Sequence, residues 1–322
     1  MEYLIPIALL LAGFVILVKG ADFLVKGASS LARRFSISEI VIGLTIVAMG
    51  TSAPELIVNI FSALKGQSDI VFGNVIGSNI SNIFLILGTA GFIYPLAVQK
   101  NTAFKEIPFA IFSGILFFVM VNDTLLFDAP ANLLSRIDGL VLLVFFIVFI
   151  LYAMKIAKVN HDEKEKNTVP DLPVWKIILF LFLGFAGLFF GGNWVVDNAV
   201  WLAKKIGISE KLISLTIVSI GTSLPELATS AVAAYQRKSD IAVGNIVGSV
   251  ILNVFFVLGA TPLFKPVSYD SAYNSDMVVF GAGLLLLFLF MFTGKRKKLD
   301  RLESLIFLSG YIAYIVYLIN RK

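Results

Sequence analysis

Residues 37–88 read ISEIVIGLTIVAMGTSAPELIVNIFSALKGQSDIVFGNVIGSNISNIFLILG, and residues 208–259 read ISEKLISLTIVSIGTSLPELATSAVAAYQRKSDIAVGNIVGSVILNVFFVLG. Each position of the first segment aligns without a gap with the position 171 residues later, and 27 of the 52 pairs are identical. The identities include Gly, Pro, Ser, Asn and Glu at fixed places, which a shared apolar composition does not produce. The chain therefore contains an internal duplication.

The similarity continues towards the N-terminus at the same offset, where Gly13 aligns with Gly184 and Gly20 with Gly191. Each half is therefore about 160 residues long, as in transporters built from internal repeats. We divide the chain into residues 1–157 with the first motif (37–88), a linker at 158–173, and residues 174–322 with the second motif (208–259).

The composition is that of a membrane protein. Hydrophobic residues make up 58% of the chain, charged residues 15%, and the mean hydropathy is +0.91, which excludes a soluble domain. The apolar N-terminal segment lacks a basic start and a cleavage site, so we expect a first spanning helix and not a signal peptide. The modest net charge of +5 lies in short loops and does not favour nucleic-acid binding.

Hydropathy predicts an all-α polytopic membrane protein of ten transmembrane helices. The expected spans are residues 3–26, 38–64, 70–97, 105–121, 137–156, 174–203, 209–235, 241–264, 276–293 and 303–319. Because each half has five spans, the second half enters the membrane in the opposite direction, which gives two inverted five-helix repeats. The polar connector from Lys158 to Asp171 holds His161, the only histidine, which we interpret as a solvated linker residue.

Loop charges predict the orientation. Of the 26 Lys and Arg residues, Lys19 and Lys26 lie in the first span and sixteen others fall on one face of the membrane. The remaining eight are Lys65, Arg136, Lys204, Lys205, Lys211, Lys265, Arg321 and Lys322. The richer face is expected to be cytoplasmic. We therefore predict a multi-pass protein of the cell (inner) membrane, with a cytoplasmic linker and both termini outside.

Glu55 and Glu226 are equivalent residues near the middle of the second and seventh spans. An ionised carboxylate there costs at least ~2.5 kcal/mol on insertion scales and needs a partner. No Lys or Arg lies at comparable depth in the two motifs, so the pair predicts a bound cation. The alternative is a pair of protonated glutamic acids that hold helices together.

The residues before the glutamates predict a broken helix in each repeat. Gly50 and Pro54, like Gly221 and Pro225, flank a Thr-Ser step, and proline removes a backbone donor. We expect the break to free backbone carbonyls of Ala48, Thr51, Ser219 and Thr222 towards a polar cavity. A simple proline kink is the alternative, but it leaves the adjoining Glu unexplained.

The second part of each motif adds polar side chains on one helix face: Asn74, Ser78 and Asn82 in the first repeat, and Asn245, Ser249 and Asn253 in the second. These oxygen ligands suit a hard cation such as Ca²⁺, which takes six to eight oxygens. With no Cys and no His in the spans, a site for a softer metal is not expected. Ser68 and Ser239 are expected N-caps of the third and eighth spans.

These motifs resemble the two alpha-repeats of the calcium/cation antiporter superfamily, and most closely its prokaryotic sodium/calcium exchangers. The resemblance covers essentially the whole chain. It implies a secondary antiporter that exchanges Ca²⁺ for Na⁺ by alternating access, with no cofactor and no enzymatic activity. A monomer in the lipid bilayer, with Ca²⁺ and Na⁺ as its substrates, is the expected state.

The resemblance also implies residue roles. Glu55 and Glu226 would bind Ca²⁺ together with Thr51 and Thr222. The flanking Na⁺ sites would be lined by Ser52, Ser78, Ser223, Ser249 and the backbone of Ala48 and Ser219, with Asn82 and Asn253 as central polar groups. Some relatives have aspartate in place of Asn82 or Asn253, and this departure makes proton or K⁺ involvement less expected here.

Two other functions remain open. A Ca²⁺/H⁺ antiporter would exchange Ca²⁺ against protons at the same glutamates. A cation channel is less favoured, because conduction requires weak sites in series and the sequence shows one site with two carboxylates.

The charge asymmetry makes a testable prediction. A cysteine introduced into the 158–171 linker should react only with a cytoplasmic thiol reagent, and one placed after Asn320 only with an external reagent. The measurement is membrane-impermeant labelling of intact cells and inside-out vesicles. Labelling of both cysteines from the same side would mean that a span of the second half has been miscounted.

Overall fold

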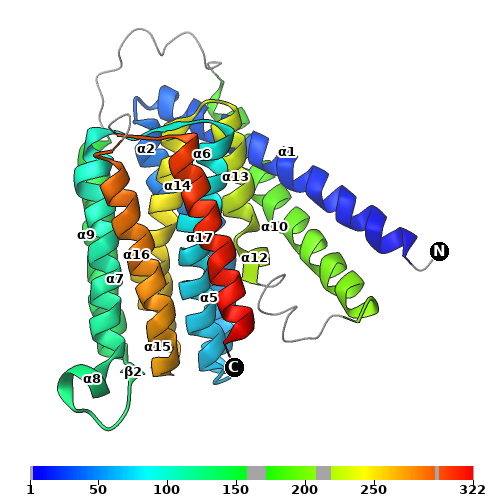
Figure 1. The fold of residues 1–322 in the computed structure, drawn as a ribbon. Coiled ribbons are helices and arrows are strands. Elements are labelled where there is room, and N and C mark those ends of the chain that lie inside the picture. Colours follow the sequence, from blue (N-terminus) through cyan, green and yellow to red (C-terminus); the bar gives the residue numbers. More distant parts are fainter. Residues whose placement is uncertain (1–2, 158–171, 208–218, 294–296, 322) are drawn as a thin grey trace.

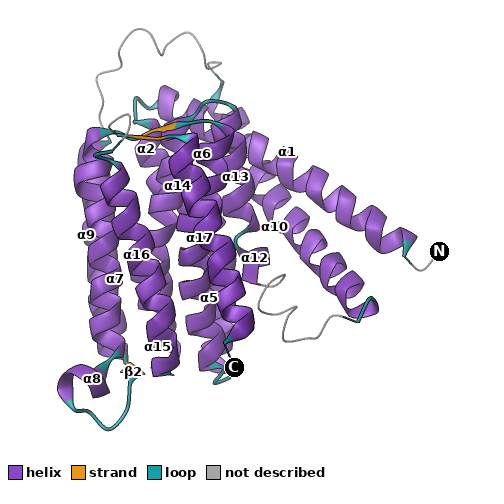
Figure 2. Ribbon diagram, in the orientation of Figure 1, coloured by secondary structure: helices purple, strands orange, loops and turns teal. Residues whose placement is uncertain are grey.

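The computed structural model describes residues 3–157, 172–207, 219–293 and 297–321, and these residues form a bundle of long helices (Figure 1). Almost all of the described structure is helical (Figure 2). The elements of the first half are α1 (Leu4–Arg34), α2 (Glu39–Ile42), η1 (Gly43–Val47), α3 (Ala48–Thr51), α4 (Ala53–Leu64), α5 (Ser68–Ile80), η2 (Ser81–Ile86), α6 (Leu87–Ile93), β1 (Leu96–Ala97), η3 (Thr102–Glu106), α7 (Ile107–Val121), α8 (Asp123–Phe127), β2 (Leu133–Leu134) and α9 (Arg136–Ile156).

The second half follows a similar order. Its elements are α10 (Val174–Lys205), α12 (Ser219–Thr222), α13 (Leu224–Tyr235), α14 (Ser239–Leu252), η6 (Asn253–Val257), α15 (Leu258–Phe264), β3 (Val267–Ser268), η7 (Ser271–Tyr273), α16 (Asn274–Phe290), β4 (Lys298–Leu299) and α17 (Arg301–Asn320). The elements η1, η2, η3 and η6 are π-helical turns, and η7 is a 3-10 turn.

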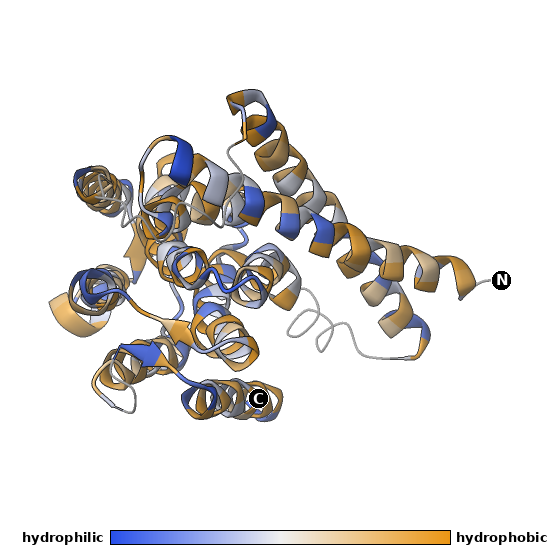
Figure 3. Cartoon of the chain, turned by 90° about the horizontal axis from the view of Figure 1, so that it is seen from above, coloured by the Kyte–Doolittle hydropathy of each residue, from blue (hydrophilic) through white to orange (hydrophobic). Residues whose placement is uncertain are grey.

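Eight helices in the described residues are long and apolar enough to cross a membrane, or nine if the bent pair Glu39–Thr51 and Ala53–Leu64 counts as one span. The expected seventh span, 209–235, is described only from Ser219, and its residues 209–218 lie outside the described part. Viewed from above, hydrophobic residues predominate along the helices (Figure 3). Large apolar side chains such as Phe61, Ile137 and Phe182 are exposed, which is typical of a surface in contact with lipid.

Two local predictions are wrong. The first helix continues to Arg34 and does not end near residue 26, because its last turns bury small residues such as Gly27, Ala28 and Ala32. The N-caps of α5 and α14 are Gln67 and Lys238, not the serines that follow them.

The turns before these helices explain the missing serine caps. Gly66 and Arg237 adopt positive φ, and the N–H groups of Gln67 and Lys238 donate to carbonyls five residues earlier, at 2.8 Å each. This left-handed ending of the preceding helix leaves Gln67 and Lys238 at the entrance of the next helix. Ser68 and Ser239 are therefore already helical.

The long helices α1 and α10 pack against each other and lean away from the remaining bundle (Figures 1 and 3). Their glycines bring the two backbones together. A Cβ added to Gly20 would lie 2.7 Å from the Leu188 nitrogen, and one added to Gly191 would lie 2.6 Å from the Leu17 nitrogen. Later residues of α1 meet earlier residues of α10, so the pair is antiparallel. Close approach through small residues is the usual means of helix association in membranes.

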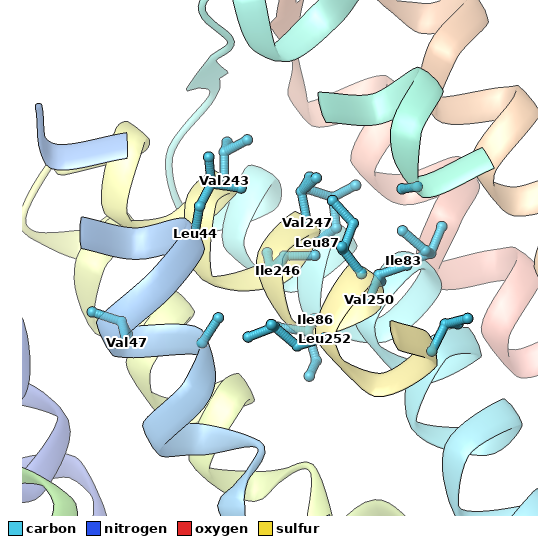
Figure 4. Close-up of a cluster of buried hydrophobic side chains, with 14 of the residues drawn as sticks. Leu44, Val47, Ile83, Ile86, Leu87, Val243, Ile246, Val247, Val250 and Leu252 are labelled. Atoms are coloured by element: carbon cyan, nitrogen blue, oxygen red, sulfur yellow. The ribbon is translucent and has the colours of Figure 1, made fainter. Parts of the chain in front are cut away.

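Helix α14 is the centre of the core, and all of its residues from Ile241 to Leu252 are buried. Figure 4 shows a cluster in which its side chains meet residues of the first half, with Leu44 and Val47 from η1 on one side and Ile83, Ile86 and Leu87 on the other. The hydrophobic core is therefore shared by the two halves.

Two short strand pairs also join the halves. Strand β1 pairs antiparallel with β4, with Leu96 opposite Leu299, and β2 pairs antiparallel with β3, with Leu134 opposite Val267. β3 lies 171 residues after β1, whereas β4 lies 165 residues after β2. Each pair thus combines one strand from each half, and the two pairs lie at opposite ends of the bundle (Figures 1 and 2).

The contact between α1 and α10 makes a testable prediction. Gly20→Val should destabilise the protein by about 1–3 kcal/mol, because the added side chain must displace the backbone of α10. Gly281→Val is the matched control, since a Cβ at Gly281 meets no atom within 4 Å. The measurement is thermal unfolding in detergent. Equal unfolding temperatures for the two variants would contradict the close approach.

Candidate functional site

Each motif contains a break at the serine that precedes the proline. Ser52 has φ −86° and ψ 5°, and Ser223 has φ −89° and ψ 5°, so both leave the helical conformation. Pro54 and Pro225 occupy the first turn of the following helix, where a missing N–H is tolerated. In the first repeat the two helical segments are bent by 43°. The predicted break is present in both repeats. A new helix begins at Ala53 and at Leu224, two residues before each glutamate.

The prediction that the break leaves the Ala48 carbonyl without a backbone hydrogen bond is wrong. The Ser52 N–H donates to this carbonyl at 2.9 Å, so Ala48 keeps its helical partner. The carbonyl that loses its helical donor is that of Gly50, because Pro54 has no N–H group to donate to it. In the second repeat the Ser223 N–H donates to the Ile220 carbonyl at 3.1 Å. A carbonyl with one partner still has a second lone pair for an ion.

The two glutamates are fully enclosed. Glu55 is 0% exposed and Glu226 is 1% exposed, and the two carboxyl groups lie close enough to interact electrostatically. The Ser52 hydroxyl donates to Oε1 of Glu226 at 3.0 Å, which links the break of the first repeat to the glutamate of the second. Both oxygens of Glu55 and Oε2 of Glu226 have no hydrogen-bond partner. Neither glutamate forms an ion pair with a described residue, so three buried carboxylate oxygens remain uncompensated.

Asn74 and Asn245 connect the two motifs in the same way. The Asn74 amide donates to Oδ1 of Asn59 at 2.7 Å and to the Glu55 carbonyl at 3.5 Å. Its own Oδ1 accepts from the Thr222 hydroxyl of the other half at 3.3 Å.

The second repeat repeats this pattern. The Asn245 amide donates to the Ser230 hydroxyl at 2.9 Å and to the Glu226 carbonyl at 3.4 Å, and its Oδ1 accepts from the Thr51 hydroxyl at 3.1 Å. Each asparagine therefore fixes the glutamate-bearing helix of its own half against the broken helix of the other half.

The predicted serines lie in the same buried region but have different partners. The Ser223 hydroxyl lies 3.3 Å from that of Ser78, across the two halves. Ser249 is 0% exposed and its hydroxyl has no partner. Thr51 is buried, whereas Thr222 is half-buried. The side chain of Ser219 lies outside the described residues.

Asn82 and Asn253 lie within or at the start of π-helical turns, η2 and η6, at equivalent positions. Such turns are frequent at functional sites. The Asn253 amide donates to Oδ1 of Asn79 at 3.1 Å and leaves its own Oδ1 unpartnered. Both polar atoms of Asn82 are unpartnered, although its side chain is buried. These neutral oxygens belong to turns that pack against the glutamate-bearing helices, η6 against α4 and η2 against α13.

Sequence reasoning missed three of these polar residues. Asn59 and Ser230 follow the glutamates by four residues, a spacing that places them on the same helix face and would have identified them. Asn79 gave no such signal, because its equivalent in the second repeat is Val250.

The site is suited to hard cations. In the described part of the chain no three His, Cys, Asp or Glu residues gather to hold a metal. What gathers is two carboxylates with hydroxyl and amide oxygens, and the ligand types fit Na⁺ and Ca²⁺. A buried, oxygen-lined site between helices of an apolar bundle is typical of a membrane protein that binds cations.

The chain belongs to the family described as "Sodium/calcium exchanger protein", which matches residues 5–155 and 176–320. It is 38% identical to the putative antiporter CaxA of Alkalimonas amylolytica, over 94% of this chain and 95% of the relative. It is 34% identical to the sodium/calcium exchanger MaX1 of Methanosarcina acetivorans, over 96% and 97%. A structure of the sodium-calcium exchanger NCX_Mj soaked with Na⁺ and Ca²⁺ matches with a TM-score of 0.82 and 32% identity, and covers 97% of this chain and 98% of that chain.

The chain is therefore a multi-pass membrane antiporter for Ca²⁺ and another cation, and not an enzyme. The family uses no cofactor, and Na⁺ and Ca²⁺ are its substrates. The resemblance to prokaryotic sodium/calcium exchangers is confirmed.

Proposed function

We propose that this protein exchanges Ca²⁺ for Na⁺ across the cell membrane by alternating access. The observation that carries the proposal is the pair of enclosed glutamates, Glu55 and Glu226, with three unpartnered oxygens and no described cationic side chain beside them. Two carboxylates balance one Ca²⁺ or two Na⁺, so either ion neutralises the site. Competition for one pair of charges is the physical basis of exchange.

The proposed architecture is ten transmembrane helices in two inverted five-helix repeats, divided into residues 1–157, the linker 158–173 and residues 174–322. The antiparallel packing of α1 with α10 supports this arrangement. The strand pairs β1–β4 and β2–β3 support it as well, because equivalent strands lie at opposite ends of the bundle. In the proposed architecture, an internal two-fold axis in the membrane plane would relate these contacts.

The proposed Ca²⁺ site consists of Glu55 and Glu226 with Thr51 and Thr222. The proposed flanking Na⁺ sites use Ser52, Ser78, Ser223, Ser249 and the backbone of Ala48 and Ser219, and Asn82 and Asn253 are the central polar groups. The contacts of Ser52 with Glu226 and of Ser223 with Ser78 support a shared cavity. The unpartnered Ser249 hydroxyl supports a ligand role for that residue.

We further propose that exchange is electrogenic. The glutamates balance two Na⁺, and the serine-lined positions offer room for additional Na⁺, so net positive charge should follow Na⁺. Each such charge couples transport to the membrane potential by ~2.3 kcal/mol per 100 mV.

The first test replaces the glutamates. Glu55→Gln and Glu226→Gln should each leave a folded protein whose Ca²⁺ affinity falls roughly 100-fold or more, because removing one partner of a buried charge pair costs about 3–5 kcal/mol. The measurement is Ca²⁺ uptake into proteoliposomes driven by a Na⁺ gradient. Glu303→Gln is the control, since Glu303 is a buried carboxylate in the capping box of α17. Ca²⁺ uptake at the wild-type rate by Glu55→Gln or Glu226→Gln would contradict the assignment of that glutamate to the Ca²⁺ site.

The second test separates Na⁺ coupling from coupling to K⁺ or protons. We expect Na⁺-driven Ca²⁺ flux to persist when an inert organic cation replaces K⁺ on both sides, because neutral Asn82 and Asn253 add no charge for K⁺ to balance. Clamping the membrane potential should shift the final Ca²⁺ gradient.

The variant Asn253→Asp should make the Ca²⁺ flux sensitive to pH, since the new carboxyl takes up a proton. Flux driven by a pH gradient without Na⁺ would support the Ca²⁺/H⁺ antiporter instead.

A further inference from the structure

A third buried glutamate lies outside the central site. Glu106 is the last residue of η3, at the start of α7, and is 1% exposed. The hydroxyl of Tyr152 on α9 donates to its Oε1. Its Oε2 is buried and has no hydrogen-bond partner.

A second unpartnered oxygen belongs to the preceding helical turn. Thr102 is 0% exposed, and its Oγ1 has no partner. Thr102 and Glu106 are four residues apart and share a helix face. Both lie at the end of the bundle that carries the β1–β4 strand pair, since β1 ends only five residues before Thr102.

The second half contains a similar arrangement with one addition. Asp276 lies in the first turn of α16, eight residues after β3, as Glu106 lies nine residues after β1. Asp276 is 2% exposed and accepts from the Tyr314 hydroxyl on α17 at 3.1 Å. Its Oδ2 forms an ion pair with the Arg321 guanidinium at 2.9 Å. A tyrosine and a cation thus satisfy this buried carboxylate.

Glu106 has the tyrosine but no cation among the described residues. The nearest charged neighbour in sequence, Lys105, is exposed, and its Nζ lies 5.9 Å from the centre of the Tyr152 ring. No ion pair within 4 Å joins a described Lys or Arg to Glu106. In Asp276 the oxygen that the tyrosine leaves free, Oδ2, accepts from Arg321, whereas in Glu106 the oxygen that the tyrosine leaves free, Oε2, has no partner.

We propose that Oε2 of Glu106 and Oγ1 of Thr102 bind one monovalent metal cation, Na⁺ or K⁺, which does for the first half what Arg321 does for the second. The ligands are oxygens, which suit a hard cation. A single carboxylate is neutralised by one positive charge, whereas a divalent ion would leave excess charge in a buried place. Because α7 also packs against η6, which holds Asn253, the cation stabilises the helices that support the transport site.

The test removes the central site first, so that its outcome does not depend on the proposed exchange function. The background protein carries Glu55→Gln and Glu226→Gln and is kept in detergent. Its unfolding temperature is measured in NaCl, KCl or the chloride of a large organic cation, at one pH and ionic strength. We expect Na⁺ or K⁺ to raise it saturably by roughly 2–4 °C over the organic cation. Adding Glu106→Gln should abolish this rise.

Two further variants sharpen the test. Glu303→Gln should keep the rise, because Glu303 lies at the same end of the bundle, has both oxygens hydrogen-bonded, and glutamine preserves its capping box. Thr102→Val removes only a hydroxyl and should raise the half-saturating cation concentration several-fold. If Glu106→Gln does not fold, Thr102→Val decides the question, and an unchanged half-saturation overturns the site.

Protonation is the competing explanation. A protonated Glu106 would make the unfolding temperature respond to pH and not to the choice of metal or organic cation, and Glu106→Gln would remove that pH response. This result would also overturn the cation site.

Discussion

The structure depends on a constraint of electrostatics: two carboxylates are held inside a membrane bundle, and no described Lys or Arg forms an ion pair with them. Glu55 and Glu226 are enclosed, and only one of their four oxygens has a hydrogen-bond partner. Such groups are costly in a medium of low dielectric constant unless a cation is present. The helix breaks and the polar side chains around them supply the polar surroundings that a carboxylate needs inside the bundle.

The central site exists only where the two halves meet. Thr51 and Thr222 each donate to an asparagine of the opposite half, and Ser52 donates to Glu226. A movement of one half against the other must therefore rearrange the hydrogen bonds that surround the ion ligands. This coupling supports the proposed alternating access, because the residues proposed as ion ligands also join the two halves. The hydrophobic core around α14 is shared in the same way.

Much of the central site could be predicted from the sequence because the duplication marks it. Glycine, proline and glutamate at identical places in two apolar segments identify the break and the charged pair. Asn79 could not be found in this way, because its equivalent is Val250, and neither could Glu106, which adjoins an expected loop. Burial and partners distinguish both residues, and these depend on neighbouring helices. The carbonyl of Ala48 was mispredicted because the break occurs after Ser52 donates to it.

Sequence alone is enough to identify the class of protein, the duplication and the two glutamates, since membrane insertion selects for apolar length and makes buried charge rare. Tertiary structure decided which oxygens are satisfied. Asp276 and Glu106 are both acids at the start of a helix, and both accept from a tyrosine. Only packing brings Arg321 to Asp276 and leaves Oε2 of Glu106 without a partner. The physical reason is that desolvation and hydrogen bonding are set by residues distant in sequence, which the order of the chain alone does not bring together.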